Sequence, residues 1–137
     1  MEDIIKEKTE LETMPIISNN ARIGLLTDIG KKRKVDEDAI LAIESMSAFE
    51  SKSSQKFLLV LADGMGGHSK GEVASKIVVN TIAEKINPAI LSQTNYTFEI
   101  NKSIQEANQR ILQYTSDHPE TEGMGSTVVC AVVDGKN

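Results

Sequence analysis

Apolar residues follow two different periods along this chain of 137 residues, and each period predicts a type of secondary structure. Short runs of β-branched and other apolar residues predict strands. The third run is apolar at every position, which is typical of a strand buried on both faces. The predicted strands are Arg22–Asp28, Ala39–Ile43, Phe57–Ala62 and Ser126–Val133.

Helical spacing of apolar residues predicts two helices between the last two of these strands. The first begins at a capping-box pattern, in which Ser69 is followed three residues later by Glu72. We expect it to end at Asn87–Pro88, because proline disfavours helical backbone in the residue before it. The second covers about residues 97–116 and carries a single apolar stripe. The polar segment Ser45–Lys56 predicts a hairpin loop.

The end of the chain bears on the domain organisation. Asp134–Gly135 is a hairpin signal, and the chain stops two residues later. Two amphipathic helices and about five strands also need a partner layer to bury their apolar faces. We therefore expect a flexible lead over residues 1–18, and over residues 19–137 the N-terminal part of a longer domain.

Composition excludes several classes of protein. A formal net charge of −5 argues against non-specific binding to nucleic acids or membrane surfaces. Cys130 is the only cysteine, so an internal disulfide and a multi-cysteine zinc site are both excluded. No apolar stretch has the length of a transmembrane helix, and the N-terminus lacks the pattern of a signal peptide. A cytoplasmic protein is the resulting expectation.

The first candidate site is the loop after the buried strand, Asp63-Gly64-Met65-Gly66-Gly67-His68. The strand fixes the backbone behind Asp63, and the glycines permit close approach of a ligand or ion. Hard cations prefer carboxylate and carbonyl oxygens, which Asp63 and Gly64 supply. An isolated Asp-Gly pair is usually only a turn, but this one lies between a buried strand and a capped helix. The Walker and dinucleotide-binding patterns are absent, which argues against a nucleotide site.

The second candidate is Arg33-Lys34-Val35-Asp36-Glu37-Asp38, which joins three acids to a guanidinium. Alternation along a strand places Glu37 on one face and both aspartates on the other. Glu37 can then face a metal while Asp38 or Asp36 orients a water, and the planar fork of Arg33 suits a phosphoryl group. By itself this segment is more typical of a solvated charged turn.

A third segment, Gly123-Met124-Gly125-Ser126-Thr127, is glycine-rich and precedes the last predicted strand. Its small residues allow a strand to pass closely under the site, although a tight turn explains them equally well. Together the three segments, in this order, resemble the type 2C family of metal-dependent serine/threonine protein phosphatases. The resemblance covers about residues 19–133, and its middle segment is similar to the microbial branch. It includes Gly71-Glu72-x-Ala74-Ser75, which follows the glycine-rich loop.

The resemblance implies an α+β fold, namely an αββα sandwich of two antiparallel sheets flanked by helices. It also implies hydrolysis of phosphoserine and phosphothreonine in proteins that are substrates of a kinase. Two divalent cations, Mn²⁺ or Mg²⁺, hold a bridging water that attacks the phosphorus directly. Carried over residue by residue, Asp63 bridges both metals, and Glu37 and the Gly64 carbonyl bind the second. Asp38 orients metal-bound water, and Arg33 clamps the substrate phosphate.

The sequence departs from the family pattern at two points. Some members have a histidine directly after the Asp-Gly pair, where this chain has Met65, and no acid role is carried onto His68. The family's later motifs, which supply the remaining aspartates, are not in the sequence. We therefore expect weak or no activity from these 137 residues alone, and aggregation through exposed apolar surface. The alternative is a non-catalytic relative that binds phosphoproteins or regulates a kinase.

Overall fold

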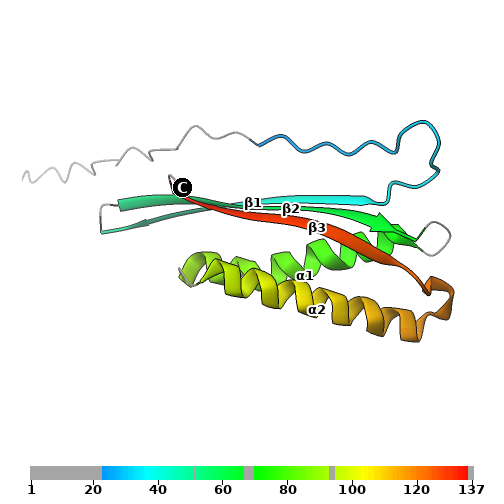
Figure 1. The fold of residues 1–137 in the computed structure, drawn as a ribbon. Coiled ribbons are helices and arrows are strands. Elements are labelled where there is room, and N and C mark those ends of the chain that lie inside the picture. Colours follow the sequence, from blue (N-terminus) through cyan, green and yellow to red (C-terminus); the bar gives the residue numbers. More distant parts are fainter. Residues whose placement is uncertain (1–22, 51, 67–69, 93–94, 136–137) are drawn as a thin grey trace, which may run out of the picture.

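An antiparallel sheet covered on one face by two helices forms the described part of the chain (Figure 1). The computed structural model describes residues 23–50, 52–66, 70–92 and 95–135. This arrangement confirms the predicted α+β class, with a helical layer outside an antiparallel sheet. The elements, in chain order, are β1 (Asp38–Phe49), β2 (Lys52–Met65), α1 (Gly71–Ser92), α2 (Tyr96–Asp117), the short 3-10 helix η2 (Pro119–Thr121) and β3 (Gly125–Asp134).

The core lies between the helices and the middle strand, which is β2. Alternate residues of β2 point at the helices, so Leu58, Val60 and Ala62 are at most 2% exposed. Burial of each large side chain contributes roughly 1.5–3 kcal/mol. The helices contribute to this core through residues three or four positions apart, among them Ala74, Val78, Ile82, Ile86, Ala107 and Ile111. The apolar run at 57–62 was therefore correctly predicted as a strand, but the expected burial on both faces is wrong at Leu61, which is 46% exposed.

The hairpin between β1 and β2 is much longer than expected. The pairing runs without interruption from Asp38 opposite Asp63 to Phe49 opposite Lys52. The prediction of a loop over Ser45–Lys56 is therefore wrong. Figure 1 shows the reason, because this end of the two strands projects beyond the helices. A ribbon without a covering layer can be polar on both faces, so its composition is that of a loop.

Helix α1 continues through Pro88 to Ser92, so the prediction that it ends at Asn87–Pro88 is wrong. Proline removes only one hydrogen bond here, close to the end of the helix. Burial of the next two residues, Ala89 at 6% and Ile90 at 1% exposure, favours the extra turn. Ser92 Oγ donates to the carbonyls of Pro88 and Ala89, which satisfies part of the helix end.

Helix α2 confirms the prediction over residues 97–116 almost to the residue, since it spans Tyr96–Asp117. Its N-cap is Asn95, whose side chain accepts a hydrogen bond from Phe98 N at 3.2 Å. None of the described helices combines the length and the apolarity that a membrane span requires.

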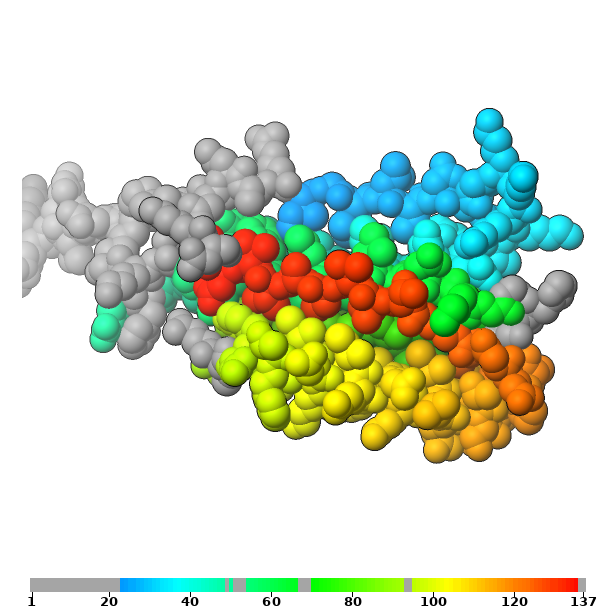
Figure 2. Space-filling view, viewed as in Figure 1, coloured from blue at the N-terminus to red at the C-terminus, as the bar shows by residue number. Residues whose placement is uncertain are grey.

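Residues 23–29 run along the face of the sheet opposite the helices, as Figures 1 and 2 show. Ile23 and Leu25 line a pocket on that face together with Leu59, Leu61 and Val129. The prediction of a strand over Arg22–Asp28 is wrong for the described residues, because none of them is assigned to a strand. Its apolar residues Ile23 and Leu25 nevertheless line a pocket on the face of the sheet, whereas a strand would pair with an edge.

The same face of the sheet carries exposed apolar side chains. Leu61 and Val129, which are opposite each other on β2 and β3, are 46% and 69% exposed. Ile40 on β1 is the other neighbour of Leu61 across the sheet. A contiguous apolar surface of this kind promotes association. This exposed face of the sheet is the surface on which the predicted partner layer would pack.

Val129→Lys is expected to reduce self-association of the chain with little loss of stability, because a charge replaces an exposed apolar side chain. Light scattering at increasing protein concentration measures the effect. The matched control is Leu112→Lys on α2, where an apolar side chain that is 62% exposed lies away from the sheet. Equal scattering by wild type and Val129→Lys, or an equal decrease in both variants, would count against the apolar face as the cause.

A buried lysine links the sheet to the helices at the end where β3 finishes. Lys56 is 4% exposed, and its Nζ donates to the Ile90 carbonyl at 3.1 Å and to Tyr96 Oη at 3.0 Å. It also lies 3.3 Å from Asp134 Oδ2. Burial by itself lowers the pKa of the Lys56 ammonium, but its bonds to Tyr96 and Asp134 outweigh that loss of hydration and raise the pKa. These contacts tie β2 and β3 to both helices at this end.

Candidate metal centre

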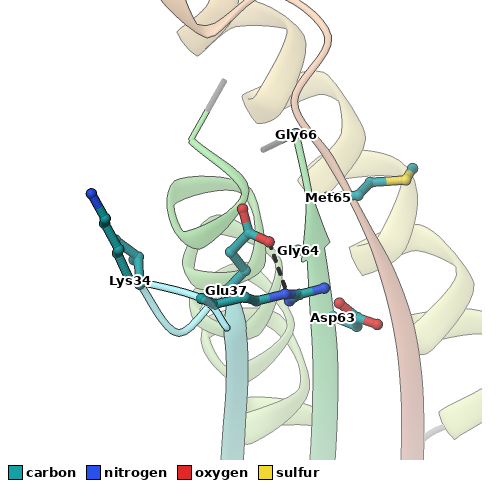
Figure 3. Close-up of a pocket in the computed structure, with 8 residues that line it drawn as sticks. Lys34, Glu37, Asp63, Gly64, Met65 and Gly66 are labelled. Carbon is teal, nitrogen blue, oxygen red and sulfur yellow. Dashed lines mark ion pairs between the residues drawn. The ribbon is translucent and has the colours of Figure 1, made fainter. Parts of the chain in front are cut away.

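The pairing of β1 with β2 brings the two predicted acidic segments together at one end of the sheet. Asp38, the first residue of β1, lies opposite Asp63. Glu37 directly precedes β1, and its carbonyl accepts a hydrogen bond from Gly64 N at 3.0 Å. A pocket of about 590 Å³ opens here, and Figure 3 shows it. Its lining residues are Arg33, Lys34, Val35, Glu37, Asp63, Gly64, Met65 and Gly66.

Two glycines pack against each other beneath this pocket. A Cβ on Gly71, the first residue of α1, would lie 3.0 Å from both Glu37 Oε1 and the Gly64 carbonyl oxygen. These two oxygens are therefore at most about 6 Å apart. A Cβ on Gly64 would fall on the Gly71 carbonyl, and within 2.6 Å of the Glu37 carbonyl oxygen. The start of α1 thus presses directly on the strand that carries Asp63.

The side chain of Glu37 is held by an ion pair with Arg33. Arg33 Nη1 lies 3.2 Å from Glu37 Oε2, and the dashed line in Figure 3 marks this contact. The two side chains differ in exposure, at 58% for Arg33 and 13% for Glu37. Lys34 lines the same pocket, but its amino group points away from Glu37 and Asp63 (Figure 3).

Asp38 titrates under the influence of its acidic neighbours. Loss of hydration raises the pKa of the Asp38 carboxyl, and the negative charges of Asp63 and Asp36 raise it further. The positive charge of Arg33 acts in the opposite direction. Asp36 also accepts a hydrogen bond from Asp38 N at 3.1 Å, which orders the entry into β1. Asp38 therefore lies next to the pocket, although it is not one of its lining residues.

The third segment passes beside the site on β3. Thr127 lies opposite Asp63, Ser126 opposite Gly64, and Gly125 opposite Met65. Ser126 Oγ donates to the Asp63 carbonyl at 3.1 Å, which adds a link behind the acid. A Cβ on Gly125 would meet Met65 Cε at 3.1 Å, so the methionine packs over this glycine.

The structure brings Arg33, Glu37, Asp63 and Gly64 into one pocket, with Asp38 beside it. His68 and the capping residue Ser69 lie outside the described residues, as do residues 1–22 and 136–137. The contact of Gly71 with Glu37 and Gly64 was not predicted. Its signal was present in the Gly71-Glu72 motif, but only the packing shows what the glycine does.

The donor atoms fit a hard divalent cation. Glu37 and Asp63 supply carboxylate oxygens and Gly64 a carbonyl oxygen, which are the ligand types that Mg²⁺ and Mn²⁺ prefer. The backbones of Gly64 and Gly71 pack so closely here that a side chain on either glycine would collide with its neighbours. In the described part of the chain, no group of three or more Asp, Glu, His or Cys side chains has the arrangement of a metal site. The two carboxylates and the carbonyl at this pocket therefore match in chemical type only part of the ligand set that such a cation takes.

Comparison with known proteins gives the same phosphatase family that the sequence motifs resemble. The sequence profile of protein phosphatase 2C matches residues 33–137. The chain is 36% identical over 109 residues to the serine/threonine phosphatase stp of Listeria monocytogenes, covering 78% of this chain and 40% of that protein. It is 38% identical over 111 residues to a putative protein phosphatase 2C-type of Streptococcus pyogenes, covering 78% and 41%.

Two solved phosphatase structures are also similar to this chain. The crystal structure of the Mycobacterium tuberculosis serine/threonine phosphatase PstP/Ppp matches with a TM-score of 0.54 and 28% identity, over 79% of this chain and 40% of that one. A bacterial serine phosphatase matches with a TM-score of 0.53 and 32% identity, over 79% and 41%. The chain belongs to the protein phosphatase 2C family. It spans about two fifths of the length of the relatives named here, at 40–41%.

Proposed function

We propose that this chain contributes one side of the active site of a metal-dependent protein phosphatase that acts on phosphoserine and phosphothreonine. The observation that carries the proposal is the convergence of Arg33, Glu37, Asp63 and Gly64 on one pocket. These residues come from a turn, the start of β1 and the end of β2, which are brought together by the β1–β2 pairing. Membership of the phosphatase family and the oxygen-only donor set support the assignment.

Each residue has a defined task in this proposal. Asp63 would hold both cations, and Glu37 with the Gly64 carbonyl would hold one of them. When bound, the cations supply Lewis acidity, which lowers the pKa of water and offsets the charge of the phosphate. Asp38, beside Asp63, would orient the attacking water by accepting a hydrogen bond from it. Arg33 positions the phosphate through its planar guanidinium, which matches two phosphate oxygens.

The proposed substrates are proteins phosphorylated by a serine/threonine kinase, and the proposed location is the cytoplasm. The names of the similar proteins from Listeria and Mycobacterium support serine/threonine specificity. The acidic net charge of −5 is unsuited to a nucleic-acid partner or an anionic membrane surface. Since the chain spans about 40% of its relatives, these statements concern the activity of a complete domain.

Release of phosphate from a phosphothreonine peptide in the presence of Mn²⁺ tests the proposal. We expect slow turnover by the 137-residue chain, because the described residues supply only part of a cation site. Asp63→Asn should abolish this turnover, whereas Asp117→Asn at the end of α2 removes the same charge and should leave it unchanged. Turnover that survives in Asp63→Asn would contradict the proposal. Manganese-dependent binding of the peptide without turnover would favour the non-catalytic alternative.

A further inference from the structure

The ion pair between Arg33 and Glu37 joins two residues that have different partners in the proposed function. Glu37 is proposed to hold a cation and Arg33 a phosphate, yet in the structure they hold each other, with 3.2 Å between Nη1 and Oε2. Among the described residues, Arg33 is the cation that pairs with Glu37. The contact is therefore a feature of the site that neither proposed role explains.

The two oxygens of Glu37 face different neighbours. Oε2 faces Arg33, while Oε1 lies on the side of Gly71 and the Gly64 carbonyl. A divalent cation shared by Oε1 and the Gly64 carbonyl would draw on the carboxylate charge that now attracts the guanidinium. It would also repel that guanidinium directly, since both are positive. Arg33 and the cation therefore compete for one carboxylate, even though they approach different oxygens.

The difference in exposure decides which partner moves. Glu37 is held against Gly71 and is only 13% exposed, whereas the Arg33 side chain is 58% exposed and free to turn into solvent. An exposed ion pair is weak compared with a divalent cation at a carboxylate. A displaced guanidinium remains at the rim of the same pocket, because Arg33 lies four residues before Glu37 on the adjoining turn.

We propose that Arg33 is an exchangeable counter-ion that keeps the Glu37 carboxylate paired and passes to the phosphate when a divalent cation takes Glu37. The exchange rests on the proposed function, and it adds a coupling between the two ligands. Cation binding releases the group that recognises phosphate, so each ligand strengthens the binding of the other. Arg33 thus has two successive partners: it pairs with Glu37 before the cation binds, and with the substrate phosphate afterwards.

Titration of the 137-residue chain with Mn²⁺ by isothermal calorimetry tests this exchange. Arg33→Gln should tighten Mn²⁺ binding by roughly two- to fivefold, which is the range expected for removal of an exposed ion pair. Lys34→Gln is the matched control, because it removes the same charge from the next residue, whose amino group points away from Glu37. In a Glu37→Gln background, Arg33→Gln should no longer tighten binding beyond Lys34→Gln.

Binding of inorganic phosphate gives the second readout. Saturating Mn²⁺ should increase the phosphate affinity of the wild-type chain more than that of Arg33→Gln. The increase in Lys34→Gln should equal that in the wild-type chain. Mn²⁺ binding through Asp63 with no difference between Arg33→Gln and Lys34→Gln would overturn the exchange alone. Failure of Asp63→Asn to weaken Mn²⁺ binding would overturn the proposed function together with it. A circular dichroism melt of each variant confirms that the compared chains are folded.

Discussion

Replacing Gly64 by alanine is expected to lower the free energy of unfolding by about 3 kcal/mol, because the new methyl group meets backbone on two sides. It falls on the Gly71 carbonyl of α1 and within 2.6 Å of the Glu37 carbonyl oxygen. Neither neighbour is the end of a flexible side chain, so α1 and β2 have to separate. The same shift threatens the hydrogen bond from Gly64 N to Glu37 O. In a thermal melt this corresponds to a decrease in Tm of roughly 10 °C.

Gly24→Ala is the matched control, since no atom lies within 4 Å of the position of its added Cβ. The control separates the effect of crowding from the general effect of a glycine-to-alanine change on the unfolded chain, which is usually slightly stabilising. A melt of Gly64→Ala that coincides with that of the control would show that α1 does not press on β2 at this point.

The second large effect is expected for Asp63→Asn, which should weaken Mn²⁺ binding by at least about 100-fold. A divalent cation next to a carboxylate gains ~4 kcal/mol of Coulomb energy even at the dielectric constant of water. Asparagine keeps the size of the side chain and its place opposite Asp38, but removes that charge. The stability of the chain should change little or increase, because the charge of Asp63 repels Asp38 and raises its pKa.

Asp28→Asn serves as the control for charge in this measurement. Asp28 accepts a hydrogen bond from Gly30 N at 2.7 Å in the neighbouring turn and does not line the pocket. Calorimetric titration of both variants separates a ligand from a general electrostatic contribution. If the two variants bind Mn²⁺ equally well, Asp63 is not a ligand.

The parts of the fold that were predicted correctly are those in which one covered face decides the pattern. Helix α2 packs one set of side chains into the core, so its period is clear, and the strand around 57–62 was recognised from its unbroken apolar run. The errors lie where tertiary context decides. Burial of Ala89 and Ile90 extends α1 past Pro88, and partner pairing turns the polar segment 45–56 into strand. Local composition carries no information about either.

The candidate site could be predicted as far as residue types and their order reach. Asp63, Glu37 and Arg33 were selected from two short motifs, and the β1–β2 pairing places the first two at one end of the sheet. The contact of Gly71 with Glu37 and the ion pair of Arg33 depend on distances between segments that are far apart in the chain or oriented by a turn. Such distances follow from the register and the helix packing, which a single sequence does not specify.

Paramagnetic broadening by Mn²⁺ in amide NMR spectra of the chain tests the central claim most directly, because it locates the cation. Lys56 and Asp134 are the far-end reference, about 30 Å along the sheet from Met65. At substoichiometric Mn²⁺, the amide signals of Glu37, Asp63, Gly64 and Gly71 should lose intensity first, while those of Lys56 and Asp134 remain. Uniform broadening, or broadening that begins at the Lys56 end, would contradict a cation site formed by Glu37, Asp63 and Gly64.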